Sequence, residues 1–425
     1  MRVTRLVAPL IPVLVLAACT HSDGSATGAR AAAAARTDAG DVIVMGMAGG
    51  IGAVDAASGR VVSLARNAVP EPDWSHVYTT APSGSGTRVD RIVTDTGEIA
   101  SSLTIAGDLT IRAVAPSGRG VALMPARDAV DDAWTPHPRA RTTIVVADLD
   151  VPSRAERFRL HGNFEPEAFS PDGETLFMLQ YRPALAPTSY RVVGLYLESG
   201  RRWVLFGPDK QPVENMTATR LVQVASPDGS HLYTLYTNQR PDYLNGSATP
   251  VASDEAAERA FVHTVDLRDG FAVCIELPDE FGSVPQEDSA VAISSDGRWV
   301  YAIDAEYGTV AVVNVHRLRV AAVSHADLSL LGGGQVHARV SADGATLFVA
   351  GDAGLVALAT ADLSGRARWM ATPGPVTGLA LSGDGARLYL TWGDQLQRLD
   401  ATTLERAEPM RLEEAGAVEF VDSTD

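Results

Sequence analysis

A short turn signal divides the chain into runs in which apolar and polar residues alternate. Its complete form is Ser, then Pro, Ser, Ala or Gly, then Asp-Gly, and it occurs at 170–173, 226–229, 294–297, 341–344 and 382–385. Degraded copies occupy 71–74 and 115–118, and Trp74 stands in the glycine slot of the first. Proline presets a turn dihedral, aspartate bonds back to nearby N–H groups, and glycine takes the positive φ. Each copy therefore predicts a tight β-hairpin, and Trp74 predicts that the first turn is distorted.

The hairpins belong to a longer repeat of four short strands. After each hairpin come another β run, a second polar turn such as 198–200 or 268–270, and a closing strand. The turn aspartates recur at intervals between 41 residues (Asp343 to Asp384) and 68 residues (Asp228 to Asp296). Four-stranded repeats of about 40–50 residues are typical of propeller blades, and no segment of the mature chain shows a helical period. The pattern predicts an all-β fold, a β-propeller.

The two ends of the repeat region complement each other. Residues 41–67 contain three strand-like runs but no innermost strand, whereas 415–421 form a spare run after the last full unit. Pairing them would make an eighth blade and remove the exposed edges of an open ring. We therefore expect one domain, 41–425, with eight four-stranded blades closed by pairing of the N- and C-terminal segments. Seven blades is the alternative if a degraded unit is not a true blade.

The first 18 residues have the features of an export signal. Arg2 and Arg5 precede an apolar stretch, 6–18, that is too short to span a bilayer. It ends in Leu-Ala-Ala-Cys19, which resembles the lipobox of bacterial lipoprotein signal peptides. The resemblance implies cleavage before Cys19 and its lipidation, so that an extracytoplasmic protein is anchored to the cell membrane. The alternative is an ordinary secretory signal with a chance cysteine.

Composition adds three points to this picture. Residues 19–40, rich in Ala, Ser, Gly and Thr, are expected to form a flexible tether. The formal charge of −17 argues against nucleic acid as a partner, because the phosphate backbone requires clustered positive charge. The second cysteine, Cys274, lies in the strand-like run 271–277, and we expect a buried, unreactive thiol with no intrachain disulfide.

Function is expected on the propeller face that carries the connections between second and third strands and between blades. Its long loops are 127–141, 182–189, 207–217, 238–258 and 279–288. They are more acidic than basic and include Trp134, His137 and Tyr243, which we take as candidate ligand-binding residues. Long loops on a rigid scaffold are common binding sites. The alternative is solvated loop charge.

A second set of candidates lies on the innermost strands. Arg112, Glu167 and Gln223 each lie five positions before the third residue of a turn signal. Glu165 is two residues from Glu167, so its side chain should point to the same side of the strand. The next three repeats have Val291, Ala338 and Leu379 at that position. The sequence therefore predicts a polar sector of the channel that contacts a ligand entering from the long-loop face. The alternative is that Arg112 and Glu167 pair with each other or contact channel water.

The turns and the stretch 308–314 resemble the bacterial YVTN/YncE-like family of propellers, which overlaps in sequence with WD40-like and lactonase-like propellers. The resemblance covers about residues 41–425 and specifies the scaffold more than the function. No nucleophile elbow, metal-binding helix or phosphate loop is present, and Ser63 stands where a quinoprotein docking repeat would have tryptophan. We therefore expect no catalytic residues, metal or cofactor. The predicted function is a membrane-anchored module that binds a protein, peptide or small molecule; the alternative is a lactonase-like or other hydrolase at the channel mouth.

Overall fold

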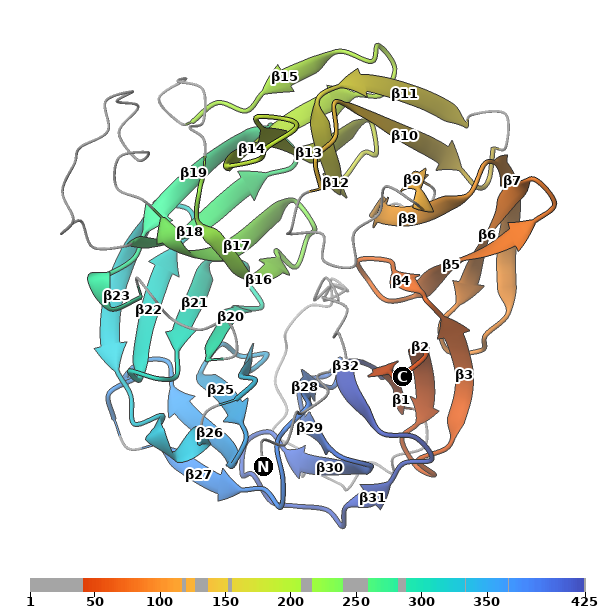
Figure 1. Ribbon diagram of the computed structural model, residues 1–425. Helices are drawn as coiled ribbons and strands as arrows, with labels where there is room; N and C mark the ends of the chain where they lie inside the picture. The colour runs from red at the N-terminus through yellow and green to blue at the C-terminus, as the bar shows by residue number, and fades with distance from the viewer. Residues whose placement is uncertain are drawn as a thin grey trace, which may run out of the picture.

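The computed structural model describes residues 41–116, 120–126, 137–151, 155–207, 216–239, 259–281, 288–332, 334–365 and 367–423. These residues form eight four-stranded antiparallel sheets arranged around a ring (Figure 1). The predicted all-β propeller with eight blades is therefore confirmed, and seven blades is excluded. The described residues contain two single-turn 3-10 helices, η4 (Asp279–Phe281) and η5 (Ser329–Leu331), and no α-helix.

The blades are numbered here in chain order, and the strands of each are given from the channel outward. Blade 1 contains β32 (Gly416–Ser423), β1 (Asp41–Met47), β2 (Gly50–Asp55) and β3 (Val61–Arg66). Blade 2 contains β4 (Val69–Pro70), β5 (His76–Ser83), β6 (Gly86–Val93) and β7 (Ile99–Ala106). Blades 3 and 4 contain β8 (Leu109–Val114), β9 (Gly120–Pro125), β10 (Arg141–Asp148) and β11 (Glu156–His161), then β12 (Asn163–Phe169), β13 (Thr175–Arg182), β14 (Ser189–Tyr196) and β15 (Arg202–Val204). Blades 5 and 6 contain β16 (Thr219–Ala225), β17 (His231–Gln239), β18 (Arg259–Asp266) and β19 (Phe271–Glu276), then β20 (Ser289–Ile293), β21 (Trp299–Asp304), β22 (Thr309–Asn314) and β23 (Arg319–His325). Blades 7 and 8 contain β24 (His337–Val340), β25 (Thr346–Gly351), β26 (Gly354–Ala359) and β27 (Arg368–Ala371), then β28 (Gly378–Leu381), β29 (Arg387–Trp392), β30 (Gln395–Asp400) and β31 (Met410–Arg411).

The ring closes through the two ends of the described chain, as predicted. The C-terminal strand β32 is the innermost strand of blade 1 and pairs antiparallel with β1, from Asp41↔Ser423 to Met47↔Gly416. It also contacts blade 8, because the Thr391 hydroxyl accepts a hydrogen bond from Val418 N at 3.1 Å. The apolar cores lie between neighbouring blades, so the contacts of Val418 and Val421 join blade 8 to blade 1.

The recurring turn is a hydrogen-bonded unit that explains its sequence. In blade 5 the Ser226 hydroxyl donates to Asp228 at 2.6 Å and accepts from His231 N at 2.9 Å, and Gly229 has φ 66°. In blade 7 the hydrogen bonds that Ser341 and Ala345 donate hold the pKa of Asp343 below its usual range. The polar groups of the turn thus form hydrogen bonds within the turn itself, which connects the first two strands of the blade.

The first turn is not distorted, contrary to the expectation from Trp74. Trp74 N donates to Glu71 O at 3.0 Å, as Gly173 N does to Ser170 O at 2.8 Å. Trp74 itself takes the positive φ, 62°, which costs a non-glycine residue about 1–2 kcal/mol. Its ring is 2% exposed and stacks on Phe420 at 6.4 Å between centroids. Burial of the indole offsets the strain, since burying a large apolar side chain stabilises by about 1.5–3 kcal/mol.

The strand order gives the ring two distinct faces. The turn face carries the connections between first and second strands and between third and fourth strands. The loop face carries the connections between second and third strands and between blades. Segments 127–136, 208–215, 240–258 and 282–287 lie outside the described residues, and the strands that flank each of them all end at the loop face. Residues 1–40, with the expected signal and tether, also lie outside the described residues, and Cys274 on β19 is half-buried rather than buried.

Candidate binding site in the channel

Two charged residues of the predicted polar sector occupy β-bulges of innermost strands. The ladder between β8 and β9 skips Arg112, and the ladder between β12 and β13 skips Glu167. Two further bulges of innermost strands lie at Leu221 on β16 and at Glu419 on β32. A bulge re-aims the side chain of the extra residue and often lies beside a functional site. Charged side chains thus occupy positions where the backbone departs from the regular ladder.

The first ionic cluster centres on Glu165 and joins blades 3 and 4. Arg112 Nε lies 2.5 Å from Glu165 Oε1, and Arg139 Nη2 lies 2.9 Å from Glu165 Oε2. The side chains of Glu165 and Arg139 are 3% and 7% exposed. A carboxylate that accepts from two guanidiniums in a nearly dry site is strongly held. Sequence reasoning missed Arg139, which precedes β10 at the loop face and donates its backbone N–H to Ala184 O at 2.9 Å.

The second cluster centres on Glu167 and joins blades 4 and 5. Arg220 Nη2 lies 2.8 Å from Glu167 Oε1, to which Gln223 Nε2 also donates at 3.1 Å. Gln223 makes a further bond to Thr234 Oγ1 at 2.8 Å. Burial alone would lower the pKa of Arg220, but Glu167 and the surrounding tyrosines raise it above its usual range. Arg220 therefore stays a cation beside its carboxylate.

A buried histidine next to this cluster is neutral. Burial first, and then the positive charge of Arg220, lowers the pKa of His263 to about 3. Its ring lies 5.9 Å from that of Tyr236, edge to face. His263, on β18, therefore contributes a neutral polar group beside the Arg220 cation.

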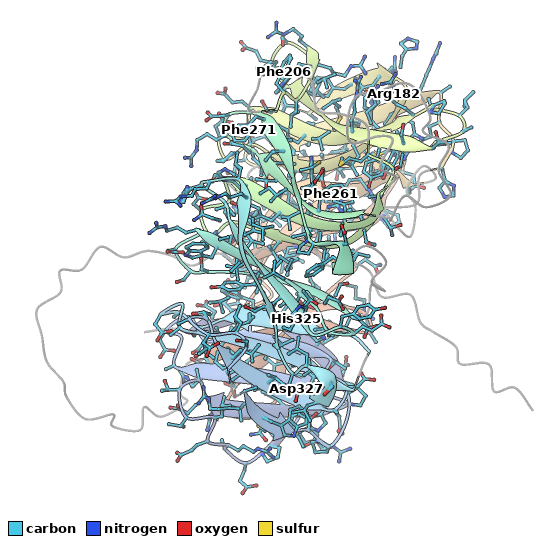
Figure 2. All side chains as sticks on the ribbon, turned by 90° about the vertical axis from the view of Figure 1, so that its left-hand side faces the viewer. Arg182, Phe206, Phe261, Phe271, His325 and Asp327 are labelled. Atoms are coloured by element: carbon cyan, nitrogen blue, oxygen red, sulfur yellow. The ribbon has the colours of Figure 1, made fainter. Side chains whose placement is uncertain are left out.

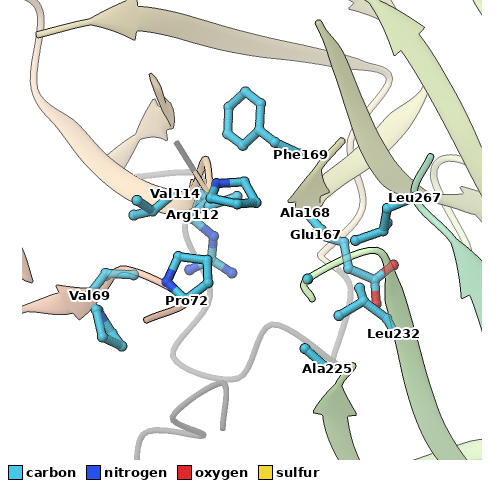
Figure 3. Close-up of a pocket in the computed structure, with 14 residues that line it drawn as sticks. Val69, Pro72, Arg112, Val114, Glu167, Ala168, Phe169, Ala225, Leu232 and Leu267 are labelled. Atoms are coloured by element: carbon cyan, nitrogen blue, oxygen red, sulfur yellow. The ribbon is translucent and has the colours of Figure 1, made fainter. Parts of the chain in front are cut away.

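The predicted polar residues therefore belong to two separate ionic clusters, whose carboxylates both lie on β12. Arg112 and Glu167 do not pair with each other: Arg112 bonds Glu165, and Glu167 bonds Arg220 and Gln223. Their side chains line one small cavity but point apart, and the Glu167 carboxylate is directed toward Leu232 (Figure 3). Residues far apart in sequence thus converge on β12 from both neighbouring blades.

The opposite side of the channel also carries charged residues, but at positions other than the counted offset, where Val291, Ala338 and Leu379 are apolar and buried. Arg339 follows Ala338 directly, and Glu419 occupies the bulge of β32. Burial raises the pKa of Glu419 to about 7, although Arg339 opposes the shift. Burial, together with Arg339, lowers the pKa of His337 to about 4. Counting a fixed offset from the turn could not find these residues, because bulges shift the register of some inner strands and not of others.

The cavity beside Arg112 and Glu167 has a volume of about 60 Å³ and reaches toward the turn face. Pro72, Pro116 and Gly229 contribute to its lining, and all three lie in or next to turns of that face. Figure 3 shows Pro72 at the edge of the cavity. The sequence predicted access from the loop face instead. A drug-sized ligand occupies about 300–1,000 Å³, so this cavity has room for a few waters and not for such a ligand.

The remaining predicted site residues have separate locations. His137 is exposed at the loop face, and its carbonyl accepts a hydrogen bond from Asn163 Nδ2 at 2.6 Å. Cys19, Trp134 and Tyr243 lie outside the described residues. In the described part of the chain, no group of three or more His, Cys, Asp or Glu side chains could hold a metal ion, and no helix is long and apolar enough to cross a membrane.

Comparison with solved structures places the architecture among known folds. The chain is an eight-bladed β-propeller. It superimposes on apo AztD from Citrobacter koseri with a TM-score of 0.51 and 10% identity, over 91% of this chain and 98% of that one. A second AztD structure from the same organism gives 0.51 and 10%, over 90% and 97%. The propeller domain of Cps50 (Swd1) from Myceliophteria thermophila gives 0.37 and 16%, over 74% and 89%.

These similarities concern the fold alone, because the identities are low. No protein-family model matches the sequence, and no curated protein matches it either. The function must therefore be argued from this propeller's own residues.

Proposed function

We propose that the protein is a lipid-anchored, extracytoplasmic propeller that binds a protein, peptide or small-molecule ligand at its loop face, over blades 3 to 5. Propellers commonly serve as binding or scaffold modules, and rigid scaffolds place binding groups on their loops. The observation that carries the proposal is the pair of buried ionic clusters around Glu165 and Glu167. Buried ion pairs add little net stability compared with apolar residues of the same size, so a role in recognition accounts better for their presence.

The location of the clusters supports the loop face as the ligand side. Arg139 reaches Glu165 from the connection between β9 and β10, and that connection belongs to the loop face. Asn163 fixes the same connection through the carbonyl of His137. A ligand that contacts this connection would therefore be coupled directly to the buried carboxylate.

A photo-crosslinker tests this face in intact cells. We expect p-benzoylphenylalanine in place of Leu185, which is 63% exposed between β13 and β14, to give a discrete adduct of protein or small molecule on irradiation. The matched control is the same substitution at Ile99, which is 56% exposed on the outermost strand of blade 2. Intact-mass analysis detects adducts of any size. Equal adducts at both positions, or none at Leu185, would rule the proposal out.

The anchor is proposed from the lipobox and has its own test. Replacing Cys19 with serine removes the thiol that would carry the lipid, so we expect the protein to move from the membrane fraction to the soluble extracytoplasmic fraction. Each buried acyl methylene contributes about 0.8 kcal/mol, which makes the change large. A Cys274→Ser variant is the control and should remain with the membrane. Retention of Cys19→Ser in the membrane fraction would contradict the anchor.

A further inference from the structure

The turn face carries an aromatic groove that the channel site does not use. Three successive turns between third and fourth strands surround it, in blades 4, 5 and 6. The groove has a volume of about 490 Å³ and is lined by Tyr196, Trp203, Phe206, Asp269, Phe271 and Leu318, with two glycines. Figure 2 shows Phe206 and Phe271 toward one side of the ring and Arg182, which ends β13 at the loop face, toward the other. The groove and the proposed ligand site therefore lie on opposite faces.

The walls of the groove are built into the blades. Gly194 on β14 leaves space for the indole of Trp203, since a Cβ there would lie 2.3 Å from the ring. The ring of Tyr196 stacks on Trp203 at 4.0 Å with an interplanar angle of 21°. Phe206 bridges to Phe271 of blade 5, and Ala272 N donates to Phe206 O at 3.1 Å. The aromatic surface is thus preorganised, and little side-chain freedom is left to lose on binding.

Large apolar side chains remain exposed on this surface. Phe206 is 46% exposed and Tyr196 is 38% exposed. Exposed aromatic residues gathered around one hollow mark an interaction site more often than scattered ones do. Aromatic residues and arginine are enriched in the centres of protein interfaces and contribute most of the binding energy there.

The rim of the groove carries positive charge on an acidic chain. Each of the three turns has one exposed arginine, namely Arg201, Arg268 and Arg317. The Arg201 guanidinium lies 5.2 Å from the centre of the Tyr196 ring, and Arg268 makes only a loose, solvent-exposed pair with Asp228 at 3.6 Å. The whole chain has a formal charge of −17, but at physiological salt charges more than about 8 Å apart are largely screened. The same turns also hold two exposed carboxylates, Glu198 and Asp269, and Asp269 lines the groove. The exposed arginines Arg202 and Arg319 follow the first and third turns directly. Arginines therefore outnumber carboxylates around the groove, and a partner there meets a net positive rim.

We propose that this groove binds an acidic polypeptide segment that inserts an aromatic or large aliphatic side chain. The anchor side chain would pack against Phe206 and the Tyr196–Trp203 stack, and flanking carboxylates would pair with the three arginines. Planar guanidiniums match carboxylates in a bidentate manner. A polypeptide is favoured over an acidic glycan because the groove combines Trp, Tyr and Arg, the residues that dominate protein interfaces. The site is independent of the loop-face ligand and would let the propeller hold a second partner.

Fluorescence anisotropy with a labelled random copolymer of glutamate and tyrosine tests the proposal on the folded propeller. We expect saturable binding that weakens about tenfold in Phe206→Ser, as for other interface anchors. The triple variant R201E/R268E/R317E should weaken it by at least about tenfold and reduce its salt dependence. All four side chains are exposed, and melting temperatures should change little.

The controls distinguish binding at this groove from nonspecific attraction to positive surface charge. The triple variant R60E/R66E/R159E changes the same number of exposed arginines elsewhere, and it should bind the copolymer like the unmodified protein. Labelled polygalacturonate, an acidic glycan, should bind at least tenfold more weakly than the copolymer. Absence of saturable binding, equal loss in the two triple variants, or equal affinity for polygalacturonate would each overturn the proposal. None of these results depends on the channel site.

Discussion

Deleting residues 414–425 should leave a chain that no longer unfolds as one stable ring. The deletion removes β32, with its full ladder to β1 and its contacts to blade 8. Val418 and Val421 are 1% and 0% exposed, and each contributes about 1.5–3 kcal/mol by burial. Ladder hydrogen bonds add about 0.5–1.5 kcal/mol each. The loss is comparable with the whole stability of a typical domain, about 5–15 kcal/mol, so we expect the cooperative transition in circular dichroism to disappear.

Two comparisons make the truncation interpretable. Removing only Thr424 and Asp425, which follow β32, should leave the transition unchanged. Gly378→Val should weaken closure without shortening the chain, because even a Cβ at this position would lie 2.3 Å from Val418 N. A truncated protein that melts like the full one would mean that the ring does not depend on β32.

Replacing Glu165 with leucine should lower the free energy of unfolding by about 3–5 kcal/mol, the cost of leaving buried charge without its partner. Arg112 and Arg139 would both lose the carboxylate that they share, and both are largely buried. The conversion of exposed Glu198 to leucine is the control and should change stability by less than about 0.5 kcal/mol. Urea denaturation measures the difference.

A triple variant distinguishes an unpaired charge from lost packing. Arg112→Met/Arg139→Met/Glu165→Leu removes every charge of the cluster and keeps similar side-chain volumes. We expect it to recover most of the stability lost in Glu165→Leu, since apolar replacements of whole buried ion clusters are often neutral or stabilising. If the triple variant were as unstable as Glu165→Leu, packing rather than charge would explain the loss.

The arrangement of the blades could be predicted because the turn residues, the spacing of the repeats and the strand pattern at the two ends all indicate it. The turns at 170–173 and 226–229 set local geometry that needs no distant contact, and their spacing gives the repeat. The missing inner strand of 41–67 and the spare strand of 415–421 predicted ring closure, because an unpaired edge is costly wherever it lies in the sequence. These inferences rest on backbone chemistry that recurs in every blade.

The channel could be predicted only in part. Arg112, Glu165, Glu167 and Gln223 were found because polar residues on innermost strands are conspicuous. Their remaining partners, Arg139 and Arg220, were not found. Arg220 lies next to a bulge of β16, and a bulge adds a residue without leaving a mark in the hydrophobic pattern. Arg139 lies in a long connection whose path depends on its contact with blade 4. Arg339 was not found because the counting assumed the same register in every innermost strand. Trp74 shows the converse, because burial overrode a local rule about positive φ.

The most direct test of the account measures ligand capture at the loop face with and without the Glu165 cluster. The photo-crosslinker at Leu185 is placed in the unmodified protein and in the Arg112→Met/Arg139→Met/Glu165→Leu variant, and adducts are quantified by intact mass from irradiated cells. We expect the adduct to fall at least about tenfold in the variant, because the connection that would contact the ligand loses the ion pair between Arg139 and Glu165 that holds it. The melting temperature of the variant should stay close to that of the unmodified protein. An undiminished adduct in a folded variant would contradict the claim that this buried cluster serves binding.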